Sequence, residues 1–237
     1  MKVEVWSDFA CPFCYIGKRR LEGALEQFAH RDDIEVEFRS FELDPNAPRD
    51  VNYSINEMLA NKYGMTVEQA QANNHNLTEQ ARQLGLDYHM DKSVLTNMFD
   101  AHRLTHFAAQ TGKREEMAER LFKGYFTDGK HLGDREALAD MAAEIGLDRA
   151  EALAALNGAD FTSEVRADEQ EASQLGVRGV PFFVLDRKYA VSGAQPSEVF
   201  LQALEKAYAE SKPFTVIGDD SDEAACTDGV CAPKTNN

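Results

Sequence analysis

Residues 6–17 read Trp6-Ser7-Asp8-Phe9-Ala10-Cys11-Pro12-Phe13-Cys14-Tyr15-Ile16-Gly17. The residues before Ser7 alternate and then become apolar, which predicts a short strand. Proline suits the first turn of a helix, and apolar residues then recur at helical spacing as far as Phe28. We therefore expect a dithiol on a strand-to-helix turn, with Cys11 at the helix N-terminus and Cys14 one turn further along.

The expected position of Cys11 favours a thiolate. The first amide groups of a helix have no intrahelical partner and, together with the helix dipole, they stabilise a negative charge. The ordinary cysteine pKa of about 8.5 falls at a helix N-terminus and in a Cys-x-x-Cys arrangement. The basic run Lys18-Arg19-Arg20 could add to this or could point to solvent, so the helix end is the stronger argument. Cys11 would then be the nucleophile, and Cys14 would resolve the mixed disulfide.

A Cys-x-x-Cys pair is also found in zinc sites and in structural disulfides. The strand before the pair, the proline inside it and the helix after it favour redox chemistry, because zinc knuckles usually lie on tight turns of small ribbons. His102 and His106 have the spacing of helical zinc ligands but lack the His-Glu-x-x-His pattern. We expect them to be packing or surface residues, and we expect no metal.

The net charge, the lengths of the apolar runs and the number of cysteines argue against several classes of function. The 237 residues carry 41 acidic and 25 basic side chains, and a net charge of -16 disfavours nucleic acid or an anionic membrane as partner. The sequence has no apolar run of bilayer-spanning length and no signal-peptide core after Met1, which predicts a cytoplasmic protein. In a reducing compartment, four cysteines indicate catalytic or redox-switched thiols more than permanent disulfides.

The periodicity of the chain predicts an α/β protein in two separated halves. Residues 34–41 alternate as a second strand, parallel to the first across the intervening helix. Only helical patterns follow for more than a hundred residues. Strand character returns in residues 180–191 as a hairpin, before a final helix. This order is that of a thioredoxin fold interrupted by an all-helical insertion domain.

Three parts are expected on this basis: a discontinuous thioredoxin-fold domain of residues 1–45 and 177–212, a helical insertion domain of residues 46–176, and an acidic C-terminal tail of residues 213–237. The tail contains Cys226 and Cys231, spaced by four residues around an Asp-Gly turn that could bring their sulfurs together. This second pair is either a functional accessory to the first, a disulfide without a catalytic role, or two incidental thiols.

Val180 and Pro181 are candidate substrate-binding residues. A cis bond between them would leave backbone groups facing the Cys11 sulfur for pairing with a client chain, whereas the competing interpretation is an ordinary proline at a strand start. Phe13 is a third candidate, because aromatic residues around the dithiol could form an apolar docking surface. That surface would also include Phe9, Tyr15 and Trp6, although Trp6 fits the core better.

Asp8 lies close to the dithiol in sequence. Its carboxylate could either cap the turn or accept the proton of Cys14, and we favour the cap.

Three groups of residues resemble the FrnE-like branch of the DsbA family: residues 7–18, Phe99-Asp100-Ala101-His102-Arg103, and residues 176–183 with Gly193-Ala194-Gln195. The resemblance runs from about residue 1 to residue 209. It implies exchange through Cys11 and Cys14, a cis proline at Pro181, and a second cysteine pair that cooperates with the first. Kappa-class glutathione transferases and hydroxychromene-carboxylate isomerases are similar in architecture but typically carry serine where Cys11 stands.

The main hypothesis is a cytoplasmic protein thiol-disulfide oxidoreductase that needs no cofactor. Its partners would be client proteins with thiols or disulfides, and glutathione or another cellular thiol reductant. One alternative is a glutathione-dependent transferase or isomerase of the kappa or hydroxychromene-carboxylate isomerase type. The other is a redox-sensing, holdase-type binding module.

Overall fold

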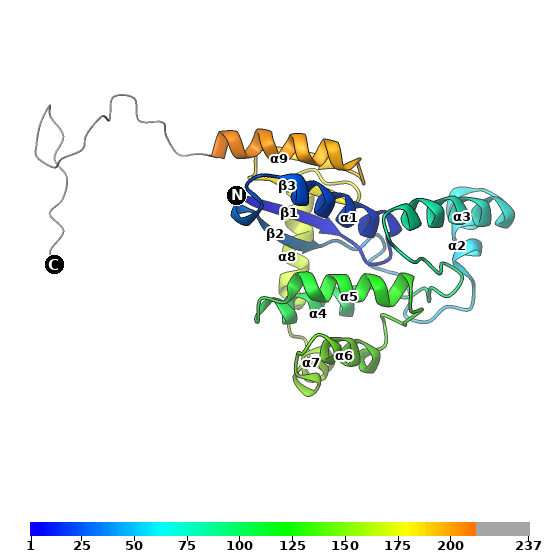
Figure 1. Ribbon diagram of the computed structural model, residues 1–237. Coiled ribbons are helices and arrows are strands. Elements are labelled where there is room, and N and C mark those ends of the chain that lie inside the picture. The colour runs from blue at the N-terminus through cyan, green and yellow to red at the C-terminus, as the bar shows by residue number, and fades with distance from the viewer. Residues whose placement is uncertain (212–237) are drawn as a thin grey trace, which may run out of the picture.

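A four-stranded mixed sheet forms the centre of the computed structural model, which describes residues 1–211 (Figure 1). Its strands lie in the order β2-β1-β3-β4, with bounds β1 (Lys2–Ser7), β2 (Glu35–Ser40), β3 (Phe182–Leu185) and β4 (Tyr189–Ser192). β1 runs parallel to β2 and antiparallel to β3. β3 and β4 form the predicted hairpin. The predicted thioredoxin fold is therefore confirmed.

Nine α-helices and one short 3-10 helix, Arg31–Asp33, accompany the sheet within the described residues. The α-helices are α1 (Pro12–Gln27), α2 (Ile55–Tyr63), α3 (Val67–Gln83), α4 (Phe99–Ala109), α5 (Arg114–Phe126), α6 (Arg135–Glu144), α7 (Arg149–Asn157), α8 (Thr162–Gln174) and α9 (Ser197–Ser211). Helices α2 to α8 all fall between β2 and β3 in the chain, so the helical insertion is confirmed.

Alternation along the strands divides the core into two layers. Val3 and Val5 of β1 belong to the large apolar cluster that includes residues of α1 and α9, whereas Trp6 packs with Ala172 of α8 on the other face. Successive side chains of a strand point to opposite faces, which is why one short strand contributes to both layers. The turn that carries Cys11 and Cys14 therefore starts from a strand that is covered on both sides.

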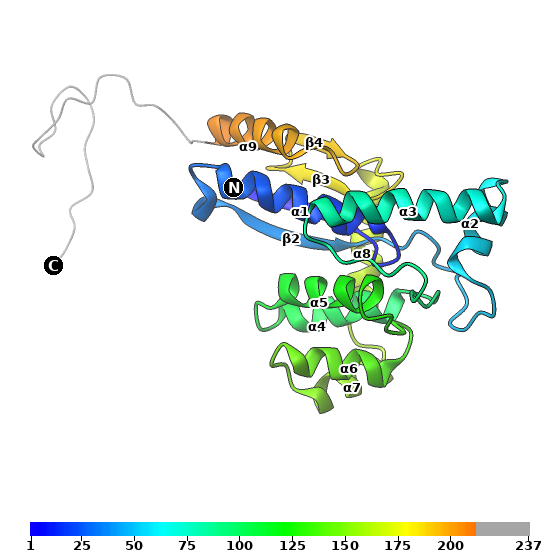
Figure 2. The ribbon, with the colours of Figure 1, turned by 45° about the vertical axis from the view of Figure 1, so that its right-hand side comes forward.

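The insertion has two parts that lie on different sides of the turn. α2 and α3 form a hairpin that projects beside the start of α1, and α4 to α7 lie below the sheet as drawn (Figures 1 and 2). Ser54 and Thr66 each begin a helix of the hairpin with a capping box. Residues 84–98 connect α3 to α4.

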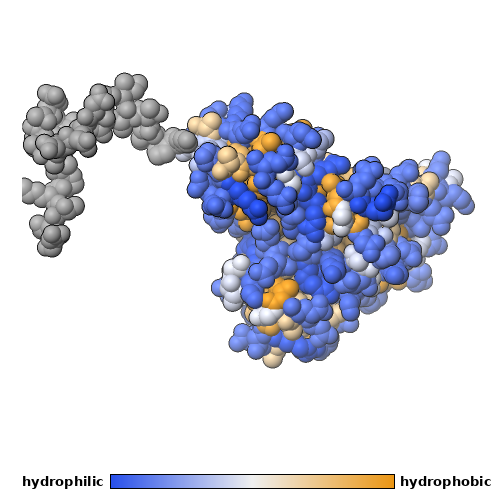
Figure 3. All heavy atoms as spheres, in the orientation of Figure 1, coloured by the Kyte–Doolittle hydropathy of each residue, from blue (hydrophilic) through white to orange (hydrophobic). Residues whose placement is uncertain are grey.

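No helix of residues 1–211 is long and apolar enough to cross a membrane. The predicted tail, with Cys226 and Cys231, lies outside the described residues. The domain limits proposed from the sequence remain predictions. Figure 3 shows a mostly hydrophilic surface on which apolar residues gather in a few small patches.

Candidate active site

The dithiol lies at the start of α1, as predicted. Cys11 is the N-cap residue, in an extended conformation, and Pro12 occupies the first helical position. The amide of Cys11 donates to the Asp8 carbonyl at 3.1 Å, and the amide of Cys14 donates to the Cys11 carbonyl at 3.0 Å. Both cysteines are free thiols and are buried, with 6% and 2% of their surfaces exposed. The local sequence thus fixes a tight turn with both sulfurs on one helix end.

The two thiols differ in acidity. A hydrogen bond from Cys14 lowers the pKa of Cys11, and the backbone amides of Cys14 and Phe13 act in the same direction, against burial and the Asp8 carboxylate. Burial raises the pKa of Cys14 well above its ordinary value, and its interaction with Cys11 raises that pKa further. Cys11 is therefore the thiol that ionises first, and Cys14 keeps its proton.

The expected contribution from Lys18, Arg19 and Arg20 is not found at the thiol. Lys18 and Arg19 pair with Glu22 on their own helix and with Glu119 on α5, and Arg20 donates to the Ala194 carbonyl. None of these charges is among the causes that lower the pKa of Cys11. Glu22 on the same helix, Glu119 of α5 and the Ala194 carbonyl hold these side chains, and Cys14 and the backbone amides of the turn are the main causes that lower the pKa of Cys11.

The Val180-Pro181 loop faces Cys11 from the other half of the fold. The bond between Val180 and Pro181 is cis, which confirms the prediction. The Cys11 sulfur lies 3.6 Å from the Val180 carbonyl oxygen, to which its thiol can donate. Gly17 permits this approach, since a Cβ there would lie 3.1 Å from Pro181 Cγ and from Phe183 Cζ.

Asp8 caps the turn, as expected. Its Oδ1 accepts from the Ala10 amide at 3.1 Å, and its Oδ2 accepts from the Leu43 amide at 2.7 Å. The carboxylate thereby connects the dithiol turn to the segment that follows β2. His102 of α4 reaches the same carboxylate, with Nε2 3.7 Å from Oδ1.

The two histidines of α4 are both packing residues, and the surface alternative was wrong. His102 is 2% exposed, and its ring lies 4.9 Å from that of Phe9. His106 Nε2 lies 3.1 Å from Asp168 Oδ2. Residues 101–106 of α4 are all buried, so both histidines are enclosed by the packing of the insertion, and their spacing of four did not by itself reveal it. Within residues 1–211, no group of three or more His, Cys, Asp or Glu residues could hold a metal ion.

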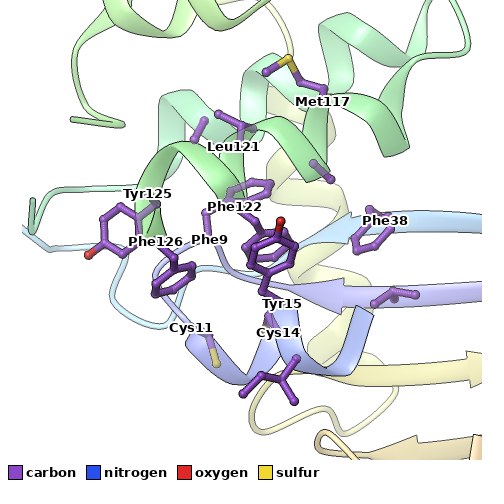
Figure 4. Packing of buried hydrophobic residues seen from close by; sticks show 14 of the residues in the cluster. Phe9, Cys11, Cys14, Tyr15, Phe38, Met117, Leu121, Phe122, Tyr125 and Phe126 are labelled. Carbon is purple, nitrogen blue, oxygen red and sulfur yellow. The ribbon is translucent and has the colours of Figure 1, made fainter. Parts of the chain in front are cut away.

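The aromatic residues near the dithiol have two different roles. Phe13 is exposed, with 47% of its surface accessible, as a docking residue would be. Phe9, Tyr15 and Trp6 are buried, so the predicted aromatic surface around the dithiol was wrong for Phe9 and Tyr15, whereas Trp6 lies in the core, as favoured from the sequence. Figure 4 shows why for two of them: Phe9 and Tyr15 pack against Phe122 of α5. Phe9 and Tyr15 thus join the dithiol turn to the insertion, and they are not available on the surface as docking residues.

Tyr88 is a site residue that the sequence did not reveal. It lies in the segment between α3 and α4, and its hydroxyl donates to the Pro12 carbonyl at 2.7 Å. Its ring stacks with Tyr15 and Phe126. Residues 84–98 carry no regular pattern that would place Tyr88 against the first helix, so only the folded insertion identifies it.

A cavity of about 1120 Å³ opens beside Cys11, between the dithiol turn and the α2–α3 hairpin. Cys11, Pro12 and Phe13 form one side of it. The opposite side is built from the hairpin and from the segments that flank it in the chain, residues 42–53 and 90–98. The sequence did not predict this cavity, because its walls come from four segments that only the insertion brings together.

Comparisons with known proteins agree with this architecture. A family model described as the DSBA-like thioredoxin domain matches residues 2–205. A probable DsbA oxidoreductase from Streptomyces coelicolor is similar over 99% of this chain and 100% of its own, with 48% identity and a TM-score of 0.86. YwbO of Bacillus subtilis, an uncharacterized protein, is 27% identical over 204 residues, which are 85% of this chain and 94% of the relative.

The fold also extends to a more distant protein. The cytosolic disulfide reductase DsbM from Pseudomonas aeruginosa is 16% identical, over 89% of this chain and 100% of its own, with a TM-score of 0.63. At that identity the likeness shows a common fold.

Proposed function

Because the chain belongs to the DSBA-like thioredoxin domain family of oxidoreductases, we propose that it exchanges thiols and disulfides with client proteins through Cys11 and Cys14. The observation that carries the proposal is the asymmetry of the two thiols. Cys11 has a lowered pKa at a helix N-terminus, whereas Cys14 is buried and keeps its proton. A nucleophilic thiolate beside a protonated resolving thiol is the arrangement that such exchange requires.

In the reducing direction, the Cys11 thiolate attacks one sulfur of a client disulfide and displaces the other as a thiolate. A mixed disulfide then joins the client to Cys11. Cys14 loses its proton, attacks the Cys11 sulfur and releases the second client thiolate, which leaves a Cys11–Cys14 disulfide. Two electrons pass from the dithiol to the client, and the oxidation of a client dithiol follows the same steps in reverse.

Val180 and Phe13 are proposed to hold the client during the exchange. The Val180 carbonyl lies 3.6 Å from the Cys11 sulfur, close enough to accept from a client amide next to the reacting cysteine. Phe13 is exposed and follows Pro12 directly, so it offers an apolar contact at the same place. Pro181 lacks an N–H group and fixes the loop that presents the Val180 carbonyl.

Reduction of insulin disulfides and refolding of a protein with scrambled disulfides test the exchange. Cys11→Ser is expected to lose activity in both assays, and Cys14→Ala is expected to accumulate mixed disulfides with the client. Turnover by Cys11→Ser at the rate of the unaltered protein would overturn the proposal. Glutathione conjugation that survives Cys14→Ala would instead support a transferase, and client protection without any cysteine would support a binding module.

Membership of the FrnE-like branch, with an accessory role for Cys226 and Cys231, is part of the proposal. Fifteen positions separate Ser211, the last residue of α9, from Cys226, and an extended chain of that length spans up to about 50 Å. Tyr208 packs on Phe28, just beyond the end of α1 opposite Cys11, and the 16 residues of α1 span about 24 Å. Chain length therefore permits exchange between the pairs.

Replacing both tail cysteines with serine tests the accessory role. Slower re-reduction of the Cys11–Cys14 disulfide, with the first exchange step unchanged, is the expected result. A trapped Cys11–Cys226 or Cys11–Cys231 disulfide in the Cys14→Ala protein would identify the contact. Unchanged re-reduction, together with no such disulfide, would exclude it. We propose the cytoplasm as the setting, where glutathione or another thiol reductant would supply electrons.

A further inference from the structure

The cavity beside Cys11 is large for a small thiol. Sites for small molecules usually enclose about 300–1000 Å³, and this one has a volume of about 1120 Å³. It starts at Cys11 and Phe13 and continues along α2 and α3, away from the sulfur. A ligand that fills it would therefore extend well beyond the reacting atoms.

The apolar part of the lining is adaptable. Four of the seven methionines of the chain line the cavity: Met58, Met65, Met90 and Met98. Methionine side chains are flexible and polarizable, and surfaces rich in them accept apolar groups of different shapes. Exposed apolar side chains are also part of the lining, among them Phe13, Leu43, Tyr53 and Tyr63. Such a surface fits the varied side chains of unfolded clients better than one rigid aromatic substrate.

Neutral amide side chains form another part of the lining. Asn61, Asn73, Asn74, Asn76 and Gln80 all belong to α2 or α3. Each amide offers both a donor and an acceptor, which is the combination that pairs with peptide groups. The α2–α3 hairpin thus presents apolar contacts together with partners for a polypeptide backbone.

The charge in the cavity is mainly negative. Its charged lining residues are Asp8, Glu42 and Asp44, with Lys62 as the basic one among the described residues. Asp8 and Glu42 are buried, with 2% and 8% of their surfaces exposed. A positively charged ligand group would be attracted here and a negatively charged one repelled.

Glu42 has an acceptor that is not used within the described protein. Arg166 pairs with its Oε2, whereas Oε1 is buried and has no hydrogen-bond partner there. Burial raises the pKa of Glu42, although Arg166 and His102 act against this. Oε1 itself is not exposed, so Glu42 acts on a ligand group in the cavity through its negative charge and not through a direct hydrogen bond from Oε1.

We propose that this cavity binds the extended client segment next to the reacting cysteine, and that Glu42 and Asp44 select segments carrying lysine or arginine. The inference rests on the proposed function and deepens it by stating the chemistry of the client. The apolar lining would take neighbouring side chains, the hairpin amides would pair with the client backbone, and the acidic residues would attract the basic group. Glutathione, which carries two carboxylates and one ammonium group, fits this lining less well.

Two matched peptide disulfides test the inference on the full-length reduced protein. They differ only in having lysine or glutamate beside the cysteine, and both carry the same apolar neighbour. We expect the lysine peptide to react about fivefold faster at low ionic strength, with the ratio falling as salt is added. Because each protein variant is scored by the ratio of the two rates, a general change in reactivity cancels.

Three variants locate the preference. Glu42→Gln and Asp44→Asn are each expected to reduce the ratio at least twofold. Asp44 is exposed, so its variant remains informative if Glu42→Gln fails to fold. Glu116→Gln removes an exposed carboxylate of α5 that does not line this cavity, and it should leave the ratio unchanged.

Reduction of the Cys11–Cys14 disulfide of the oxidised protein by dithiothreitol separates the two levels of the proposal. Equal rates for the two peptides, a preference for the glutamate peptide, or faster reaction of glutathione disulfide than of the lysine peptide would overturn the inference. In each of these cases, normal dithiothreitol exchange at Cys11 would leave the proposed function intact. Loss of exchange with the peptides and with dithiothreitol alike would overturn both.

Discussion

The acidity of Cys11 depends on a side chain that is itself kept from ionising. Cys14 is buried, so it keeps its proton, and that proton is the largest cause of the lowered pKa of Cys11. The helix N-terminus contributes through the amides of Cys14 and Phe13. The lowered pKa of Cys11 is therefore a property of the pair of cysteines and not of Cys11 alone.

Cys14→Ala should raise the pKa of Cys11, because the hydrogen-bonded proton is lost while the burial of Cys11 remains. Cys14→Ser should raise it less, since a hydroxyl still donates. The absorbance of the thiolate near 240 nm, followed against pH, measures both values. Cys11→Ser is the control and should remove this titration. A Cys11 pKa that is unchanged in Cys14→Ala would contradict the assignment.

Gly17→Ala should disturb the contact between α1 and the Val180-Pro181 loop. Its new Cβ would lie 3.1 Å from Pro181 Cγ and Phe183 Cζ, so these neighbours must move by a few tenths of an ångström. Gly23→Ala is a matched control on the same helix, with an ordinary contact of 3.4 Å to Ser197 Oγ. Both substitutions gain helix propensity, so we expect Gly17→Ala to be less stable than Gly23→Ala by about 1–2 kcal/mol.

Urea unfolding of the two variants gives this difference directly. Equal free energies of unfolding would show that the Val180-Pro181 loop moves to accommodate the new Cβ without loss of stability. Slower client exchange by Gly17→Ala, together with unchanged exchange by Gly23→Ala, is the expected functional counterpart.

At the scale of the element, α1 and α5 are joined by a charged network as well as by aromatic packing. Glu119 of α5 accepts from the Tyr15 hydroxyl at 2.6 Å and lies 2.9 Å from Lys18 Nζ, and it also pairs with Arg19. Lys18 is nearly buried, with 5% of its side chain exposed. Its charge therefore depends on acidic partners that include one from the insertion.

Glu119→Gln should destabilise the protein at neutral pH and much less in acid. Burial alone would raise the pKa of Glu119, but hydrogen bonds from Arg19 and Tyr15 and the charge of Lys18 lower it to about 2. A carboxylate whose pKa is lowered on folding stabilises above its unfolded value of about 4.3. We expect a loss of about 1–3 kcal/mol at pH 7, since the group is one third exposed.

The difference from the unaltered protein should shrink as the pH falls from about 4.5 towards 2, because Glu119 binds a proton first in the unfolded state and in the folded state only near pH 2. Urea unfolding at several pH values measures it. Glu116→Gln, on the same helix but exposed, should show little change at any pH. A constant difference across this pH range would contradict the role assigned to the charge.

At the scale of the whole molecule, Asp168 of α8 joins the insertion to the sheet. Its carboxylate accepts from the Ser40 amide at 2.9 Å and lies 3.1 Å from both Arg39 Nη1 and His106 Nε2. Its backbone carbonyl accepts from Trp6 Nε1 at 3.0 Å. One residue therefore connects β1 and β2 of the sheet with α4 and α8 of the insertion. We expect the sheet and the insertion to unfold together.

Asp168→Asn should cost about 3 kcal/mol, because Arg39 and His106 would lose a buried partner. Trp6 is the one tryptophan of the chain and is fully buried beside this residue, so its fluorescence reports the transition. Asp140→Asn breaks an exposed pair with Arg149 and should change stability by less than about 0.5 kcal/mol. Similar losses in the two variants would argue against the connecting role.

The sequence predicted the order of the helices and strands because each has its own hydrophobic periodicity and its own residues that favour a start or an end. Cys11 and Pro12 mark a helix start. The presence of the dithiol then favoured the interpretation of Val180-Pro181 as a cis bond facing Cys11. What it could not predict are contacts between segments that have no pattern linking them. Glu119 opposite Lys18, Tyr88 on the Pro12 carbonyl and the cavity wall formed by α2 and α3 all depend on how the insertion packs.

The pairing of Cys11 with the Val180 carbonyl joins positions 169 residues apart in the chain. Ribosomes add about 5–20 residues per second, so the cysteine turn is synthesised roughly 10–30 s before the loop that covers it. Throughout that interval the nascent chain carries Cys11 without this cover. The contact between Cys11 and the Val180 carbonyl is therefore acquired late in translation, and premature termination within the insertion yields a fragment that retains both cysteines but lacks the Val180-Pro181 loop.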